Sequence, residues 1–196
     1  MFFGRYAPWE SYPKKLSHFE VVNPLVVITD FFSANLLGGH RKKLKKWLHY
    51  AVKDKVYKDK RHGPGSLLFF YDLNVRLLEA AYLLYYNDRI AKNEKVIVSA
   101  TQLEVERKLW EDFPENLSHK EMHGPYQAFK KVFRKISLQR YRDYLHEWLY
   151  AALYIKGGND ELEADEIKLV YKNMRKLYSA VWLIYHRENK GSVKNI

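Results

Sequence analysis

The sequence predicts an all-α fold of about six helices, arranged as a bundle or an orthogonal array. Two observations support this prediction. Apolar residues recur at intervals of three and four along most of the chain, which is the period of an α-helix. The one segment that resembles a strand, residues 95–98, has no second strand with which to pair. With 196 residues, of which 47% are hydrophobic, we expect one domain over 1–196 that starts with an extended segment, residues 1–23.

Three helices are predicted in the first half of the chain, over about 23–37, 40–58 and 66–87. Asn23 and Pro24 are expected to start the first of them, as a capping residue and a first-turn proline. The pair Gly38-Gly39 is expected to end it. Ser66 follows a Gly-Pro-Gly turn and is expected to cap the third helix.

Three more helices are predicted in the second half, over about 99–112, 125–156 and 159–189. Ser99 has the spacing of a capping box with a glutamine three residues later, and it starts the fourth helix. The same spacing at Ser118 predicts a single turn inside the loop that follows. The pair Gly157-Gly158 is expected to separate the last two helices.

Two parts of the chain resemble each other, at an offset of about 100 residues. Residues 40–89 and 141–188 both contain Arg, Leu, Trp-Leu and Ala at one spacing, followed by Asn, Arg, Leu, Ala and Tyr at another. Each part has the pattern of an αα-hairpin, so a true duplication predicts two pseudo-symmetric hairpins. The alternative is that amphipathic helices rich in Leu, Ala and Tyr resemble each other by chance.

The composition excludes several classes of function. The chain has no cysteine, which removes disulfides, thiolate metal sites and cysteine nucleophiles; a reducing, cytoplasmic location fits this composition. The most apolar stretch, residues 66–86, carries charges near its middle, so we expect a buried helix and no membrane partner. The N-terminus has no uninterrupted apolar region and therefore predicts no signal peptide.

A basic segment gives the main functional hypothesis. Between residues 40 and 62, ten lysines and arginines stand against two aspartates. Such a face neutralises phosphates, and it predicts a non-enzymatic binding or regulatory module that contacts nucleic acid or an acidic protein. The alternative is a solvated lysine face over an apolar stripe. The side chains expected to bind are Arg41, Lys42, Lys43, Lys45 and Lys46.

The turn after this segment is a second candidate binding site. Arg61 and His62 precede the glycine-rich turn that leads into a helix at Ser66. Free backbone N–H groups at such a turn can bind an anion. The turn lacks the length and the lysine of a P-loop, and the alternative is that it only caps the helix.

A third candidate is a buried polar site on the third helix. Asp72, Arg76 and Glu79 share one face of an otherwise apolar helix. Two carboxylates beside an arginine can bind a substrate or exchange protons. The alternative is a structural ion-pair network that fixes helix packing.

Arg140 and His146 give the enzymatic alternative. Their Arg-x5-His spacing is similar to the Arg-x(4–6)-His motif of HEPN-type ribonucleases, which are all-helical domains that cleave RNA without a metal. The resemblance implies that Arg140 and His146 are a catalytic pair. A chain with 8 histidines also contains about one such spacing by chance.

The remaining expectations concern cofactors and assembly. No His-x3-His or Glu-x-x-His pair is expected on one helix, and nucleotide fingerprints are missing, so we expect no metal and no cofactor. A third alternative is a protein–protein assembly module, which predicts an exposed apolar patch. The sequence leaves the oligomeric state open.

Overall fold

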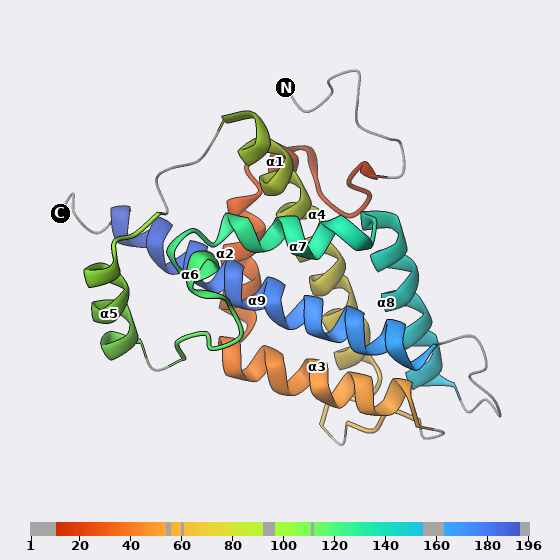
Figure 1. Cartoon of the computed structure of the whole chain (residues 1–196). Helices are drawn as coiled ribbons and strands as arrows, with labels where there is room; N and C mark the ends of the chain where they lie inside the picture. Colours follow the sequence, from red (N-terminus) through yellow and green to blue (C-terminus); the bar gives the residue numbers. More distant parts are fainter. Residues whose placement is uncertain are drawn as a thin grey trace.

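The computed structural model describes residues 11–53, 56–59, 61–91, 97–110, 112–154 and 163–192. These residues form nine helices and no strand, which confirms the all-α prediction (Figure 1). The expected number of about six was too low, because two short helices form in predicted loops and one long predicted helix is two. The helices are α1 (His18–Val22), α2 (Leu25–Ala34), α3 (Leu37–Ala51), α4 (Gly65–Ala91), α5 (Ala100–Leu109), α6 (His119–His123), α7 (Tyr126–Lys135), α8 (Leu138–Leu153) and α9 (Ala164–Ser192).

Within the segment over 1–23 that was predicted to be extended, residues 18–22 form the helix α1, and residues 1–10 lie outside the described residues. Ser17 and Glu20 form a capping box that starts α1, in which each side chain bonds to the backbone N–H of the other. Asn23 is the C-terminal cap of α1, and Pro24 takes the N-terminal cap position of α2. The predicted start of α2 is therefore correct to within two residues, but Asn23 does not cap it.

The glycine pair Gly38-Gly39 lies inside the first turn of α3 and does not end the preceding helix. The two glycines allow neighbouring side chains to approach the backbone at the start of α3 closely. A Cβ atom at Gly39 would overlap the side chain of Asn35, which links α2 to α3. At Gly38 a Cβ would lie 3.3 Å from the carboxylate of Asp112, which accepts a bond from the Gly38 N–H. Glycine at these two positions thus leaves room for the side chains of Asn35 and Asp112 and does not reverse the chain.

The predicted helix over 125–156 is interrupted between α7 and α8. Ile136 has an extended backbone, and the Ser137 hydroxyl accepts a bond of 3.2 Å from the Arg140 N–H to cap α8. Two other caps are as predicted. Ser99 accepts from the amide three residues later at the start of α5, and Ser118 forms a capping box at the start of α6. Residues 95–98 were predicted as a strand or a linker, and residues 97 and 98 belong to neither a helix nor a sheet. Residues 95 and 96 lie outside the described residues, and so does the pair Gly157-Gly158.

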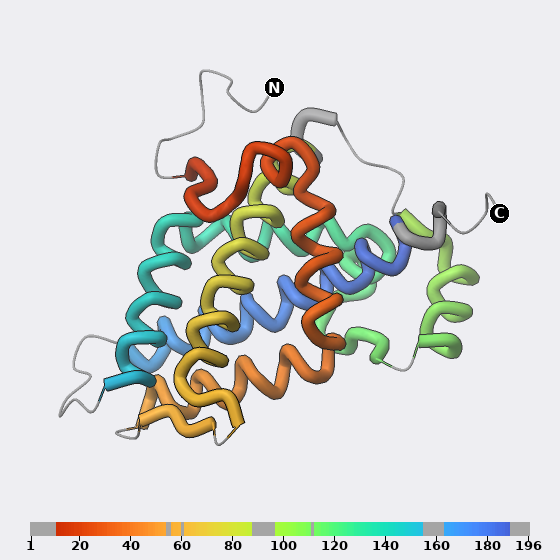
Figure 2. The backbone as a smooth tube through the Cα atoms, turned by 180° about the vertical axis from the view of Figure 1, so that it is seen from behind, coloured from red at the N-terminus to blue at the C-terminus, as the bar shows by residue number. Residues whose placement is uncertain are grey.

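The long helices form two crossed layers. In Figure 1, α3, α7 and α9 run from side to side, with α9 between the other two. The helices α2, α4 and α8 run from top to bottom and cross this first layer. Figure 2 shows from behind that α4 lies between α2 and α8. The arrangement is therefore an orthogonal array and not a parallel bundle. None of the helices in the described ranges has an apolar stretch long enough to cross a bilayer.

The core joins the two predicted hairpins. Trp47 of α3 and Trp148 of α8 are fully buried and meet edge to face at 5.9 Å between ring centroids. Two buried asparagines sit between helices: Asn74 accepts a bond from the hydroxyl of Tyr178, and Asn173 donates to the hydroxyl of Tyr141. Both tryptophans and both asparagines are equivalent positions in the proposed repeat, which remains a prediction.

Candidate functional site

The outer face of α3 carries four exposed lysines. Leu44 and Trp47 are fully buried and fix the rotation of the helix, so that the lysines between them point outward. Three of the lysines project within about 100° of one another around the helix axis. Among the described residues, none of the four forms an ion pair. They are Lys42, Lys43, Lys45 and Lys46.

Aromatic rings support two of these lysines. The ammonium of Lys46 lies 4.8 Å from the ring centroid of Tyr57, and that of Lys43 lies 5.9 Å from the ring centroid of Phe70. A cation–π contact orients a lysine without neutralising it. The two ring contacts therefore leave the charges of Lys43 and Lys46 in place, and the described carboxylate of Asp59 acts on Lys46 only through space.

Arg41 differs from its neighbours because it points inward. Its guanidinium donates to Asn116 at 3.0 Å and to the hydroxyl of Ser179 at 2.9 Å. Burial lowers the pKa of Arg41, and the nearby guanidinium of Arg175 lowers it further. The buried Nε atom of Arg41 has no hydrogen-bond partner among the described residues. Arg41 thus belongs to the junction of α3 with α9 and not to the exposed lysine face.

A pocket of about 340 Å³ opens beside this junction. Arg175 lies over the ring of Tyr171, with 5.8 Å between the guanidinium and the ring centroid. Lys172 is exposed, and neither Lys172 nor Arg175 forms an ion pair within the part of the chain that is described. The full lining is Asn116, Tyr171, Lys172, Arg175 and Lys176. Two uncompensated cations therefore face a pocket that is large enough for a phosphate group.

The fifth lining residue, Lys176, forms an ion pair with Glu121. This buried carboxylate lies 2.6 Å from Lys176 and 2.9 Å from Lys131, and it accepts a bond from the Ser118 N–H. Burial alone would raise the pKa of Glu121, but the two lysines and Ser118 together lower it to about 2. Glu121 therefore joins α6 to α7 and α9, and it leaves Lys172 and Arg175 as the free cations of the pocket.

Sequence reasoning did not identify this pocket. The spacing of 171, 172, 175 and 176 places them on one helix face, which is a signal that could have been read. The proximity of Arg41 to Arg175 could not have been read, because the two residues come from helices that are distant in sequence.

The predicted anion site at the turn is occupied by the chain itself. The carboxylate of Asp59 accepts bonds from the N–H groups of Arg61 (3.0 Å) and His62 (3.1 Å) and from the hydroxyl of Ser66 (3.1 Å). The two N–H bonds lower the pKa of Asp59 to about 2. Ser66 is the second residue of α4 and donates its hydroxyl, so it is not the N-terminal cap that was predicted. The N–H groups of Arg61, His62 and Gly63 are thus bonded to Asp59, and anion binding by the rest of the turn stays a prediction.

Asp72, Arg76 and Glu79 do share one face of α4, and each is bonded to another part of the chain. Asp72 forms an exposed ion pair with Lys15 at 3.1 Å. Arg76 pairs with Glu20 of α1. Asp72 and Arg76 therefore attach residues of the N-terminal segment and α1 to α4, as the structural alternative expects.

Glu79 is the most tightly held of the three. It is fully buried, and its carboxylate is bonded by Arg142 of α8 at 2.6 Å and 2.9 Å. The same carboxylate accepts bonds from the backbone N–H groups of Lys14 (2.9 Å) and Lys15 (2.8 Å). Arg142 also donates to the carbonyl of Tyr12. One buried acid thus fixes α8 and the N-terminal segment to α4.

The two residues of the ribonuclease hypothesis lie on α8 with different surroundings. Arg140 lies over the ring of Tyr144 at 4.2 Å and near the carboxylates of Glu147 and Glu166, at 3.6 Å and 3.7 Å. His146 is exposed, and its ring lies 6.5 Å from that of Tyr71. Six positions on a helix separate two side chains by about 120° around the axis. The ribonuclease activity stays a prediction, and this geometry adds no support to it.

A histidine pair on α6 contradicts one expectation. His119 and His123 have the His-x3-His spacing, and both lie on a single short helix that the sequence had suggested only as a turn. Their Nε2 atoms are 3.4 Å apart. Among the described residues there is no group of three or more His, Asp and Glu side chains that could hold a metal ion.

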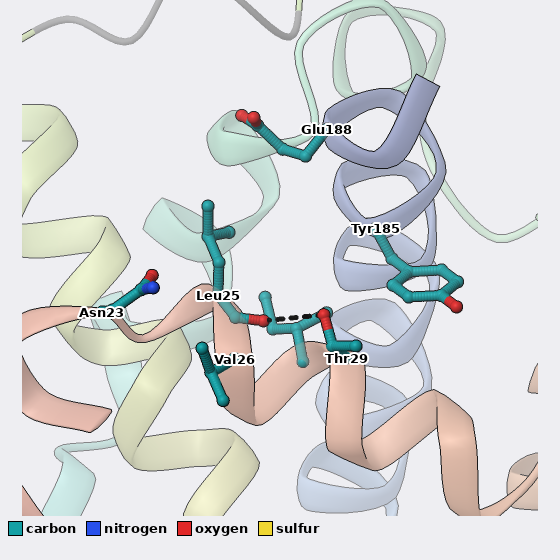
Figure 3. Close-up of a pocket in the computed structure, with 7 residues that line it drawn as sticks. Asn23, Leu25, Val26, Thr29, Tyr185 and Glu188 are labelled. Atoms are coloured by element: carbon teal, nitrogen blue, oxygen red, sulfur yellow. Dashed lines mark hydrogen bonds between the residues drawn. The ribbon is translucent and has the colours of Figure 1, made fainter. Parts of the chain in front are cut away.

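A second pocket, of about 330 Å³, has a different character (Figure 3). Leu25, Val26 and Thr29 come from the start of α2, and Tyr185 and Glu188 come from the end of α9. The Thr29 hydroxyl donates to the Leu25 carbonyl, so towards a ligand it can only accept a hydrogen bond. An apolar pocket with a carboxylate at its edge does not suit an anion, so it is not part of the basic site.

Exposed apolar side chains are spread over several helices. Eight of them lie close together two by two on α1, α4, α5 and at the end of α8, namely Phe19 with Val22, Leu68 with Phe69, Val105 with Leu109, and Tyr150 with Tyr154, the C-terminal cap of α8. No one pair marks an interface, and the assembly hypothesis stays a prediction.

Comparisons of the chain with models of protein families, with curated proteins and with solved structures found no match.

Proposed function

We propose that the protein is a non-enzymatic binding module whose α3 face contacts the phosphate backbone of a nucleic acid. The observation that supports this most is the state of Lys42, Lys43, Lys45 and Lys46, which are exposed and form no ion pair with the described carboxylates. A buried apolar stripe holds them in place on a regular helix. Uncompensated, preorganised positive charge is what supplies affinity for phosphates.

The pocket beside α9 adds to this proposal. Arg175 and Lys172 extend the positive surface from α3 towards α9, and Arg41 lies behind them. Lysines make point contacts and do not read base edges as arginines do. The expected binding is therefore salt-dependent and tolerant of nucleic-acid sequence.

The test is a charge reversal of the α3 face. We expect the unaltered protein to bind short RNA or DNA at about 50 mM salt and to lose about 100-fold in affinity at about 200 mM. A variant with Lys42, Lys43, Lys45 and Lys46 all changed to Glu should bind at least tenfold more weakly. Its slope of log affinity against log salt should fall by about 3 to 4, since each phosphate contact contributes about 0.9. Filter binding across a salt series measures both quantities.

The matched control reverses four exposed cations elsewhere, so that the net charge changes equally. Suitable residues lie on α5 and α7, namely Lys108, Lys130, Arg134 and Lys135. This control should retain most of the affinity. Absence of binding at low salt, or an equal loss in the two variants, would refute a specific role for α3.

A further inference from the structure

The histidine pair on α6 brings two ring nitrogens together, at a distance that a hydrogen bond between the rings or a shared ion can occupy. His119 is exposed and His123 is half-buried, and their ring centroids are 4.5 Å apart. The Nε2 atom of one ring faces the Nε2 atom of the other at 3.4 Å. We propose that His119 and His123 form a two-point binding site for a divalent transition-metal ion such as Zn²⁺.

The distance between the two nitrogens fits such an ion. Zinc binds imidazole nitrogen at about 2.0–2.1 Å in tetrahedral geometry. Two ligands at that bond length and a tetrahedral angle lie about 3.3–3.4 Å apart. The observed 3.4 Å therefore matches the separation of two zinc ligands, and only the orientation of the rings has to adjust for both lone pairs to face the ion.

A backbone carbonyl fixes the tautomer of one ring. The Nδ1 atom of His123 lies 2.7 Å from the carbonyl oxygen of Val98, which can only accept a hydrogen bond. Nδ1 must therefore carry the proton, and the Nε2 lone pair is left free to face His119. The Val98 N–H also donates to the His123 carbonyl at 3.1 Å, so the ring and its backbone are held together. Orientation of a histidine ligand by a carbonyl is typical of metal sites.

The surroundings determine what kind of site this is. Arg187 donates to the His123 carbonyl, but its charge is paired with the buried Glu106 at 2.8 Å. The described residues supply no third protein ligand, so water would complete the coordination. An open site with two imidazoles favours Cu²⁺, Zn²⁺ and Ni²⁺ over Mg²⁺ or Ca²⁺, which prefer oxygen ligands.

Binding would also stabilise the fold locally. α6 has only five residues, and it carries Glu121, which holds Lys131 of α7 and Lys176 of α9. An ion that joins the first and last residues of this helix would hold its only turn closed. The proposal therefore predicts that the ion raises the melting temperature as well as binding.

The experiment titrates the full chain, prepared without a histidine tag, with ZnCl₂ at about pH 7.5, where imidazole is neutral. Calorimetry should show one equivalent bound, and the melting temperature should rise with it. His119→Ala should weaken binding by about tenfold or more. MgCl₂ at the same concentration should give neither binding nor a shift.

His49→Ala is the control, because His49 is an exposed histidine on another helix. It should bind zinc as the unaltered protein does. His123→Ala also removes the bond to Val98, so the exposed His119 carries the test if that variant unfolds. Failure of the unaltered protein to bind one equivalent of zinc, or unchanged binding in His119→Ala, would overturn the proposal.

Discussion

At the scale of single residues, the neighbours His40 and Arg41 show how little sequence position says about environment. Both were part of one basic segment in the sequence. His40 is fully buried and stacks on Phe31 at 3.8 Å between ring centroids, with its Nε2 atom 2.7 Å from the Phe31 carbonyl. That carbonyl can only accept, so Nε2 carries the proton of a neutral ring. Burial lowers the pKa of His40 from 6.5 to about 4.

This pKa predicts a loss of stability in mild acid. Between about pH 6.5 and 4 the unfolded chain binds a proton at His40 and the folded chain does not, so stability is complete above pH 6.5 and declines towards pH 4. The shift corresponds to a loss of up to about 3 kcal/mol. Urea unfolding at several pH values between these limits measures it.

A His40→Phe variant separates this contribution from others. It should lose roughly 1 kcal/mol at pH 7, from the bond to Phe31, but its stability should change much less between pH 6.5 and 4. Glu121 titrates lower, because its pKa moves from 4.5 to about 2, so its contribution is lost only below pH 4.5. An equally steep decline from pH 6.5 to 4 in His40→Phe would exclude His40 as the cause.

At the scale of helices, the start of α8 depends on one hydroxyl. We expect Ser137→Ala to destabilise the protein by about 1 kcal/mol, because the Arg140 N–H loses its acceptor. Ser33→Ala is the control, since its hydroxyl donates to the Thr29 carbonyl within α2 and caps nothing. Urea denaturation of both variants checks this prediction, and equal stability of the two would contradict it.

The same helix start shows why some boundaries could be predicted and others could not. Ser99 and Ser118 stand between a polar loop and an apolar stretch, so their capping spacing is visible in the sequence. Ser137 lies between Ile136 and Leu138, both buried, and the apolar period continues through the break. Periodicity reports which side chains are buried and not whether the backbone between them is continuous.

The candidate site was predictable to a similar extent. The four outward lysines follow from the buried positions on either side of them, because a helix places residues by angle. The inward position of Arg41 and the pocket at Arg175 depend on how α3 meets α9. Helix crossings are set by side-chain shape over the whole contact, which a single sequence does not display.

At the scale of the whole molecule, the two parts of the proposed repeat differ in how they neutralise an equivalent arginine. Arg41 and Arg142 occupy the same place in the repeated pattern. Arg142 faces Glu79, whereas Arg41 faces Ser179 and Asn116, which are neutral. The charges of Asp112 and Glu115 act on Arg41 only through space, so Arg142 is bonded directly to a carboxylate and Arg41 is not.

The ion pair of Glu79 with Arg142 should therefore be critical for stability. Glu79→Gln leaves a buried guanidinium without its partner charge, which costs about 3–5 kcal/mol. Asp72→Asn removes an exposed ion pair from the same helix and should cost less than about 1 kcal/mol. Thermal and urea unfolding of the two variants compare a buried pair with an exposed one on one helix face.

A double variant distinguishes a lost attraction from a stranded charge. In Glu79→Gln with Arg142→Met, no charge is left buried, so the double variant should be more stable than Glu79→Gln alone. Recovery will be incomplete, since the Lys14 and Lys15 N–H groups bond to different oxygens of the Glu79 carboxylate, and glutamine replaces one of these oxygens with an NH₂ group that cannot accept a bond. If the two single losses simply add, Glu79 acts mainly through the N-terminal segment and not through α8. That result would mean that the bonds from Glu79 to residues 14 and 15 contribute more to stability than its ion pair between α4 and α8.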